Sequence, residues 1–155
     1  MLNMNNNETS LDKDVNAIKI KPFPGPAHES HKHAWPTWFP HVVGCARDSG
    51  PGIAGHAGLI ISAQEYQRRF GVAFQAKVLP LDLAHDADAA QIAIHTRETA
   101  DYLKEERFIK LFRNKLLMAI DEQAQTACGT GEMLADMAPR DLLARLEGLF
   151  FFFFF

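Results

Sequence analysis

Four histidines near the start of the chain form its densest group of potential metal ligands: His28, His31, His33 and His41. Imidazole nitrogens at such short spacing can bind zinc, copper or nickel. The surrounding segment is rich in proline and supplies no carboxylate or thiolate set that would complete a structural metal site. We therefore expect adventitious metal binding and no metal cofactor. A small metal-binding or metal-dependent hydrolytic protein is the alternative function.

A glycine pattern follows at Gly50, Gly52 and Gly55, with the G-x-G-x-x-G spacing of dinucleotide-binding folds. The context does not fit that use, because no apolar strand precedes it, Pro51 lacks a backbone donor, and no helix follows directly. We interpret these glycines as a tight turn. His56 comes next, but the sequence places no serine or cysteine nucleophile with it as a base. We expect its ring to make a structural hydrogen bond.

Charged residues mark the longest segment with a helical apolar pattern. Asp86 and Asp88 could form a carboxylate pair for acid–base or metal chemistry, but acidic residues also stabilise a helix start, and we interpret them as caps. Further along, basic residues alternate with acidic ones, which is typical of a solvated helix face with i,i+4 ion pairs. An RNA-facing stripe is the other interpretation of these basic residues: Lys104, Arg107, Lys110, Arg113 and Lys115.

The overall composition is that of a globular protein. With 155 residues, of which 47% are hydrophobic and 23% charged, the chain is long enough for one domain with a buried core. A formal net charge of -3 lacks the basic excess of a dedicated nucleic-acid binder. Cys45 and Cys128 are too few for a disulfide framework. No secretory signal precedes the domain and the apolar run 149–155 is too short to span a bilayer, so we expect a cytoplasmic protein without membrane contact.

The chain divides into three parts. Residues 1–30 are polar and then Pro-rich, which predicts a flexible, disordered lead-in. A helical domain is expected over 31–149, and a tail of six phenylalanines over 150–155. The domain begins with aromatic and branched residues interrupted by two prolines, which predicts a short, irregular helix over 33–46.

The elements that follow His56 are predicted from turn and capping signals. Apolar residues over 59–61 predict a strand or buried extended chain. Ser62 and Glu65 have the spacing of a capping box, which predicts a helix over 63–70. Residues 71–83 are expected to be a loop or extended segment.

The longest element is a helix from Asp86 or Asp88 to about Gln123, because apolar residues recur at three- and four-residue steps without glycine or proline. A break is expected near 104–107, where charges cluster. Pro139 fits the first position of a last helix, with Gly148 near its end.

The run at 50–66 reads Gly-Pro-Gly-Ile-Ala-Gly-His-Ala-Gly-Leu-Ile-Ile-Ser-Ala-Gln-Glu-Tyr. It resembles a motif in the N-terminal Gag region of copia-type retrotransposons from algae, diatoms and oomycetes, with Ala63 where proline is common. Gly71-Val72-Ala73-Phe74, the long helix and the closing Asp-Leu-Leu-Ala-Arg-Leu run at 141–146 follow in the same order. The resemblance covers roughly Ala34 to Leu146.

The resemblance implies an all-α (mainly α), small capsid-like domain with a long central helix. Such a protein is not an enzyme, and it self-assembles into particles around element RNA. One set of residues is the structural family motif: Gly55, His56, Gly58, Leu59, Ser62 and Tyr66. A second set belongs to the core and assembly helices: Leu103, Ile109, Phe112, Leu116, Leu142, Leu143 and Leu146.

The expected partner is another copy of the chain, with no cofactor, no metal and no small-molecule substrate. Gag of this family commonly carries a C-terminal zinc knuckle, and this chain has no Cys-x-x-Cys pair, so we expect RNA binding to be weak. Residues 150–155 replace the family's aromatic-glycine ending, as if the reading frame passed into a poly-T tract. A decayed, non-functional fragment is therefore a second alternative.

Overall fold

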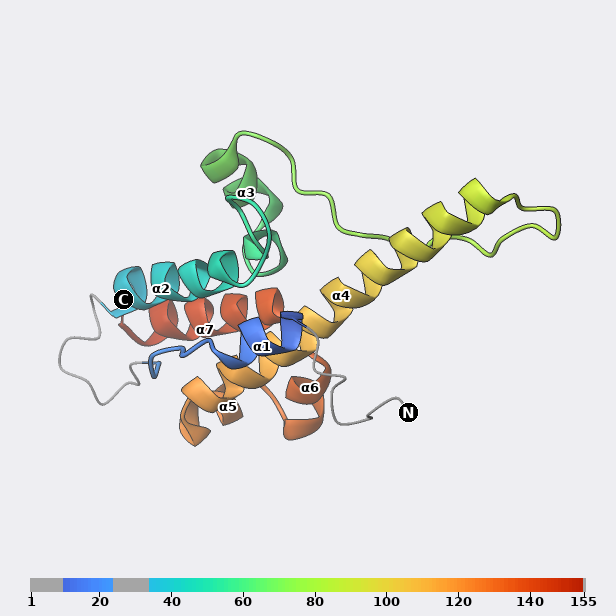
Figure 1. Cartoon of the computed structure of the whole chain (residues 1–155). Helices are drawn as coiled ribbons and strands as arrows, with labels where there is room; N and C mark the ends of the chain where they lie inside the picture. Colours follow the sequence, from blue (N-terminus) through green and yellow to red (C-terminus); the bar gives the residue numbers. More distant parts are fainter. Residues whose placement is uncertain (1–9, 24–33, 155) are drawn as a thin grey trace.

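The computed structural model describes residues 10–23 and 34–154, and this part of the chain is mainly helical without strands, as the sequence predicted. These described residues form seven α-helices and one 3-10 helix around a single core (Figure 1). In chain order they are α1 (Ser10–Asn16), α2 (Ala34–Asp48), η3 (Ala57–Leu59), α3 (Ala63–Phe70), α4 (Ala89–Ala119), α5 (Glu122–Cys128), α6 (Gly131–Asp136) and α7 (Pro139–Phe154).

The long central helix α4 begins after Asp88, which forms a reciprocal capping box with Gln91. Of the two aspartates that we interpreted as caps, Asp88 is the helix cap, and Asp86 lies in the turn before it. The helix is continuous through 104–107, where we had expected a break, because local charges do not remove any helical hydrogen bond. It ends before Gln123, because the backbone turns extended at Ile120 and Asp121 then caps the separate helix α5.

The helix α2 is longer and more regular than the short, irregular helix that we predicted. It continues through Pro40, which removes one backbone donor from the helix interior. Apolar residues at three- and four-residue steps place a continuous stripe in the core and offset that loss. The buried residues of the stripe are Trp35, Trp38, Val42, Val43 and Ala46.

For 59–61 we predicted a strand or buried extended chain; the segment is buried, but it forms no strand. It forms the 3-10 helix η3, and Ile60 and Ile61 follow it into the core. The predicted helix over 63–70 is confirmed as α3, with the Ser62 hydroxyl accepting the backbone N–H of Glu65. Gly71 ends it in the left-handed conformation.

Part of the expected flexible lead-in is packed on the domain. Within 10–23, Leu11 and Val15 of α1 are buried in the core against α4, and Ile18, Ile20 and Phe23 pack against it further along. These five apolar residues bury enough area to hold the segment on the domain. The lead-in's remaining residues, 1–9 and 24–30, lie outside the described part of the chain.

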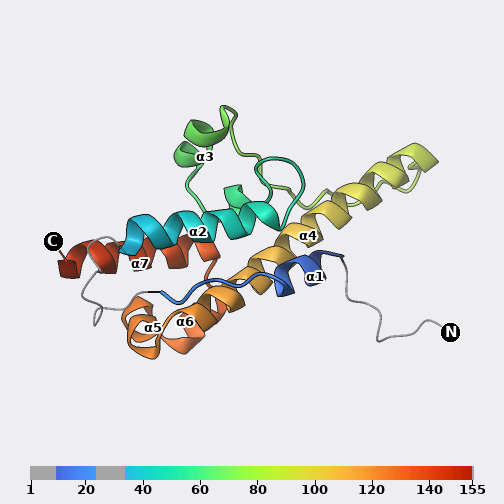
Figure 2. The ribbon, with the colours of Figure 1, turned by 60° about the vertical axis from the view of Figure 1, so that its left-hand side comes forward.

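The last helix α7 begins at Pro139, as predicted, and lies alongside α2 in both views (Figures 1 and 2). It does not end near Gly148, because that glycine does not adopt the left-handed conformation that would end the helix. The backbone stays helical to Phe154.

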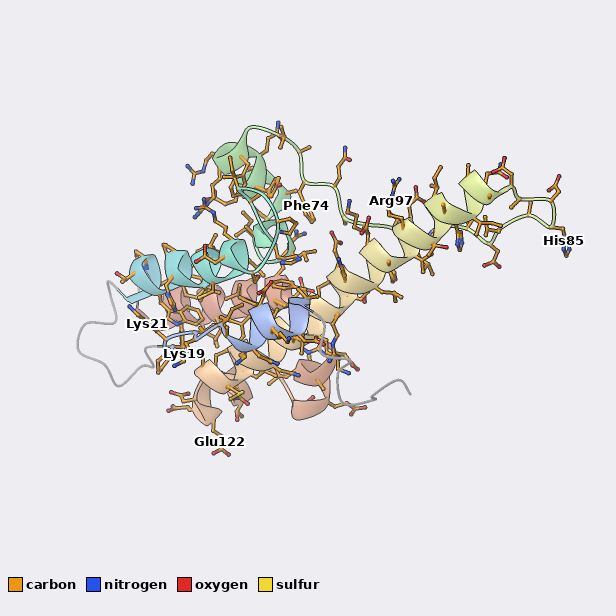
Figure 3. The ribbon with its side chains drawn as sticks, viewed as in Figure 1. Lys19, Lys21, Phe74, His85, Arg97 and Glu122 are labelled. Carbon is orange, nitrogen blue, oxygen red and sulfur yellow. The ribbon has the colours of Figure 1, made fainter. Side chains whose placement is uncertain are left out.

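The first half of α4 projects from this body (Figures 1 and 2). An extended segment leads from α3 outward along α4, turns, and enters the helix at its far end. We refer to residues 75–103, the extended segment with the first half of α4, as the arm. Its tip is the turn around His85 (Figure 3).

Candidate self-association surface

The glycine turn between α2 and η3 is packed too closely for larger residues. Gly55 has a φ of 52°, and a Cβ there would lie 2.6 Å from the carbonyl carbon of Arg47. Gly58 is buried, and a Cβ there would lie 2.7 Å from Cγ of Phe74. The Arg140 side chain donates to the Gly58 carbonyl. The turn is therefore a structural junction between α2, η3 and α7.

His56 is fixed inside this junction. Its backbone N–H donates to the Ala46 carbonyl at 3.0 Å, and its ring stacks on Phe108 of α4 at 4.1 Å between centroids. Nδ1 lies 3.4 Å from Oγ of Ser49, a partner that the sequence did not indicate. Burial lowers the pKa of His56 below its usual value, and a hydrogen bond to the backbone of Ser49 partly opposes this. The ring is therefore neutral at pH 7.

A cleft of about 600 Å³ opens beside His56. Ser49 and His56 are a hydroxyl and an imidazole that meet in it, but the Ser49 hydroxyl donates to the Ala46 carbonyl at 2.9 Å and is 4% exposed. The serine proton is thus directed away from the imidazole that would have to accept it. The pair stabilises the turn and is not arranged for nucleophilic catalysis.

Of the four clustered histidines, His41 lies within the described residues. His41 accepts the backbone N–H of Lys21 through Nε2 at 3.0 Å, so this nitrogen is occupied. His28, His31 and His33 lie outside the described residues. Elsewhere in 10–23 and 34–154, no three histidine, cysteine or acidic side chains are grouped as metal ligands.

The basic side of α4 is largely used for packing within the chain. Arg107 forms an ion pair with Asp12 of α1 at 3.0 Å, and Lys115 donates to the Asn16 carbonyl at 3.2 Å. Arg113 reaches the carbonyl that follows α6. Three of the five basic residues thus attach neighbouring segments to α4, which leaves a short basic stretch for any RNA contact.

The predicted core and assembly residues separate into two groups. Leu103 is 56% exposed and Ile109 is half-buried, so these two are accessible from outside. The others lie in the core and are 2% exposed or less: Phe112, Leu116, Leu142, Leu143 and Leu146. Buried side chains stabilise the body and cannot meet a partner unless it opens. Most of the exposed apolar side chains of α4 lie in its first half, and Met118 is exposed near its end.

No family model, curated protein or solved structure matches the chain. Within the described residues, no helix is long and apolar enough to cross a membrane.

The arm carries most of the accessible apolar surface. Of the eleven large apolar side chains exposed in the described part of the chain, seven belong to the arm. At on the order of 100 Å² each, they expose about 700 Å² of apolar area in total, distributed over the faces of the arm. They are Val78, Leu79, Leu81, Leu83, Ile92, Ile94 and Leu103.

Sequence reasoning identified only Leu103 of this set. Leu79, Leu81 and Leu83 alternate with other residues, which is the pattern of an extended segment with one apolar side. That alternation was the available signal. Ile92 and Leu103 gave no signal of exposure, because their spacing fits the same apolar pattern as the core-facing residues of α4.

Proposed function

We propose that this chain is a non-enzymatic structural protein that self-associates, and that it is the capsid-like part of a copia-type retrotransposon Gag. The arm carries this proposal, because seven of the eleven large apolar side chains exposed in the described residues gather on this one projecting element. The helical body supports it further, since the neutral His56 and the bonded Ser49 form a structural pair.

The motif residues behind the Gag resemblance have structural roles, which supports the resemblance as one of fold. Gly55 and Gly58 allow close backbone packing, and His56 stacks on the central helix. Ser62 caps α3, whose Tyr66 contacts Phe74 at 5.2 Å between ring centroids. Residues with these roles determine how α2, α3 and α4 meet, so a shared motif implies a shared junction.

RNA is a secondary partner in this proposal. Lys104 and Lys110 are exposed near the base of the arm and could contact phosphates. So few cations provide a weak, strongly salt-dependent interaction. We expect filter binding to detect RNA only at low ionic strength, in contrast to self-association through apolar surface, which salt does not weaken.

Light scattering after size-exclusion chromatography tests the proposal. We expect the full chain to form discrete, concentration-dependent oligomers below about 1 mM, the weak limit of specific association. The same chain ended at Leu149 is the control for aggregation through the phenylalanine tail, and circular dichroism checks that both are helical. Oligomers in both chains support the function. A strict monomer in both contradicts it and favours a decayed fragment that keeps only its fold.

A further inference from the structure

We infer that the arm is the self-association surface, and that two copies of this chain pair arm to arm in antiparallel order. This inference rests on the proposed function and specifies its partner and contact residues. A pair of this kind has two-fold symmetry, in which the same patch of each copy forms both halves of the interface.

The exposed face of α4 within the arm has the pattern of a helix-pairing stripe. Ile92, Thr96, Thr99 and Leu103 follow one another at three- and four-residue steps and therefore share one face. Ile92 is 47% and Leu103 56% exposed, although both lie on a helix whose other half is in the core. The two threonine hydroxyls donate to backbone carbonyls of their own helix, so the face carries no hydroxyl that needs an outside partner. A second helix can pack there.

The extended segment adds to this face. It runs beside the first half of α4 in both views (Figures 1 and 2). Its start is attached to α4 by the Lys77 backbone N–H, which donates to Glu105 at 3.0 Å. Leu79, Leu81 and Leu83 then widen the accessible apolar surface, and Leu81 is 90% exposed. At on the order of 100 Å² each, Ile92 and Leu103 together with these three leucines offer about 500 Å² per copy, the size of a weak, concentration-dependent interface.

Charge decides the direction of pairing. The arm has five acidic and two basic residues, a net charge of -3, and its tip 82–88 has three aspartates without lysine or arginine. The next stretch of α4, 104–115, which we call the base, has five basic and two acidic residues. Arg107 is paired with Asp12 there, and Lys104 and Lys110 are exposed and available to a partner. Parallel pairing would place the acidic tips together, whereas antiparallel pairing places each tip over the basic base of the other arm.

The register follows from the same stripe. When Ile92 lies opposite Leu103 of the second copy, Asp88 lies opposite Arg107 of that copy by residue count. The pairing centre then falls near Arg97, which is drawn on the arm away from the body (Figure 3). Nucleic acid is a poor alternative occupant, because an acidic, apolar arm repels phosphate.

The apolar contact is tested with Ile92→Gln and Leu103→Gln together in the full chain. Glutamine keeps helix propensity and both positions are exposed, so the fold is retained. The matched control is Ile53→Gln, since Ile53 is 81% exposed and belongs to the glycine turn, outside residues 75–103. We expect association, measured by analytical ultracentrifugation, to weaken by about tenfold or more in the arm variant and to be unchanged in the control.

The direction is tested by charge reversal. One variant has Asp82→Lys and Asp86→Lys at the tip, and the other has Lys104→Glu and Lys110→Glu at the base. Each alone should associate about tenfold more weakly than the original chain, because tip and base then carry the same charge. An equimolar mixture should recover association as a mixed dimer. Circular dichroism checks the fold of each variant.

The outcomes separate this inference from the proposed function. If the original chain associates and both arm tests leave association unchanged, the inference is overturned and self-association proceeds through another surface. If the charge variants are weakened and their mixture does not recover, the antiparallel order is overturned. A strict monomer of the original chain overturns the proposed function and the inference together.

Discussion

The buried Gly58 gives a sharp test of how the glycine turn is packed. A Cβ on Gly58 would lie 2.7 Å from Cγ of Phe74, and two further ring atoms would be closer. Cγ lies on the Cβ–Cγ axis about which the ring rotates. Ring rotation therefore does not move Cγ and cannot make room. Phe74 would have to move as a whole, although it contacts Tyr66 and lies beneath the Arg140 guanidinium at 5.9 Å. Gly58→Ala should therefore disturb a packed aromatic group.

The magnitude follows from two opposing effects. Overpacking of this kind costs about 1–3 kcal/mol, so we expect Gly58→Ala to lower the free energy of unfolding by about 2 kcal/mol. In a Phe74→Ala background the collision is absent, and Gly58 has no left-handed φ. There the same change should stabilise the protein by about 0.4–1 kcal/mol, because alanine restricts the unfolded chain. The sign of the effect should therefore reverse between the two backgrounds.

Urea denaturation of the four proteins in this cycle measures the coupling. In the original background, Gly58→Ala should also lower the melting temperature by about 4–8 °C. Gly44→Ala is the matched control, since no atom lies near that Cβ position and the residue is inside α2. It should be neutral or stabilising. Equal costs of Gly58→Ala with and without Phe74 would refute the packing that we describe.

Three further changes test other contacts. Because burial lowers the pKa of His56 below 6.5, the unfolded state binds the proton first as pH falls. Urea midpoints should fall on acidification from pH 6.5 down to the lowered pKa, and less steeply in His56→Gln. Arg107→Ala should cost about 1 kcal/mol through its ion pair with Asp12 and increase amide exchange in α1, whereas unchanged exchange would argue against this attachment. Trp38→Phe removes the 2.7 Å bond from Nε1 to the Lys21 carbonyl, with an expected loss of about 1 kcal/mol in urea unfolding. A loss near zero would mean that water replaces it.

The elements with local signals could be predicted from the sequence. The Ser62 cap and Gly71 define α3, and Pro139 begins α7, because caps and prolines act within a few residues. The start of α4 at Asp88 follows from the same physics. These signals need no knowledge of the tertiary structure.

The remaining features depend on contacts between distant segments. The packing of Lys21 and Phe23 comes from bonds to Trp38, His41 and Ala119, and nothing in the local sequence encodes those partners. The apolar pattern of α4 likewise cannot indicate where the body ends and the arm begins. Exposure of an apolar residue is a property of its neighbours in space, so sequence could not separate Ile92 from the core.

Because α4 is one uninterrupted helix, it fixes the distance between the cores of two paired copies. Phe108, in the core, lies about ten residues beyond the pairing centre between Ile92 and Leu103, which corresponds to roughly 16 Å of helix. Two paired copies would hold their cores about 30 Å apart without a hinge between them. The curvature of any larger shell would then depend on the crossing angle of the two helices. A local unfolding of α4 would change both the shell geometry and the stability of the body.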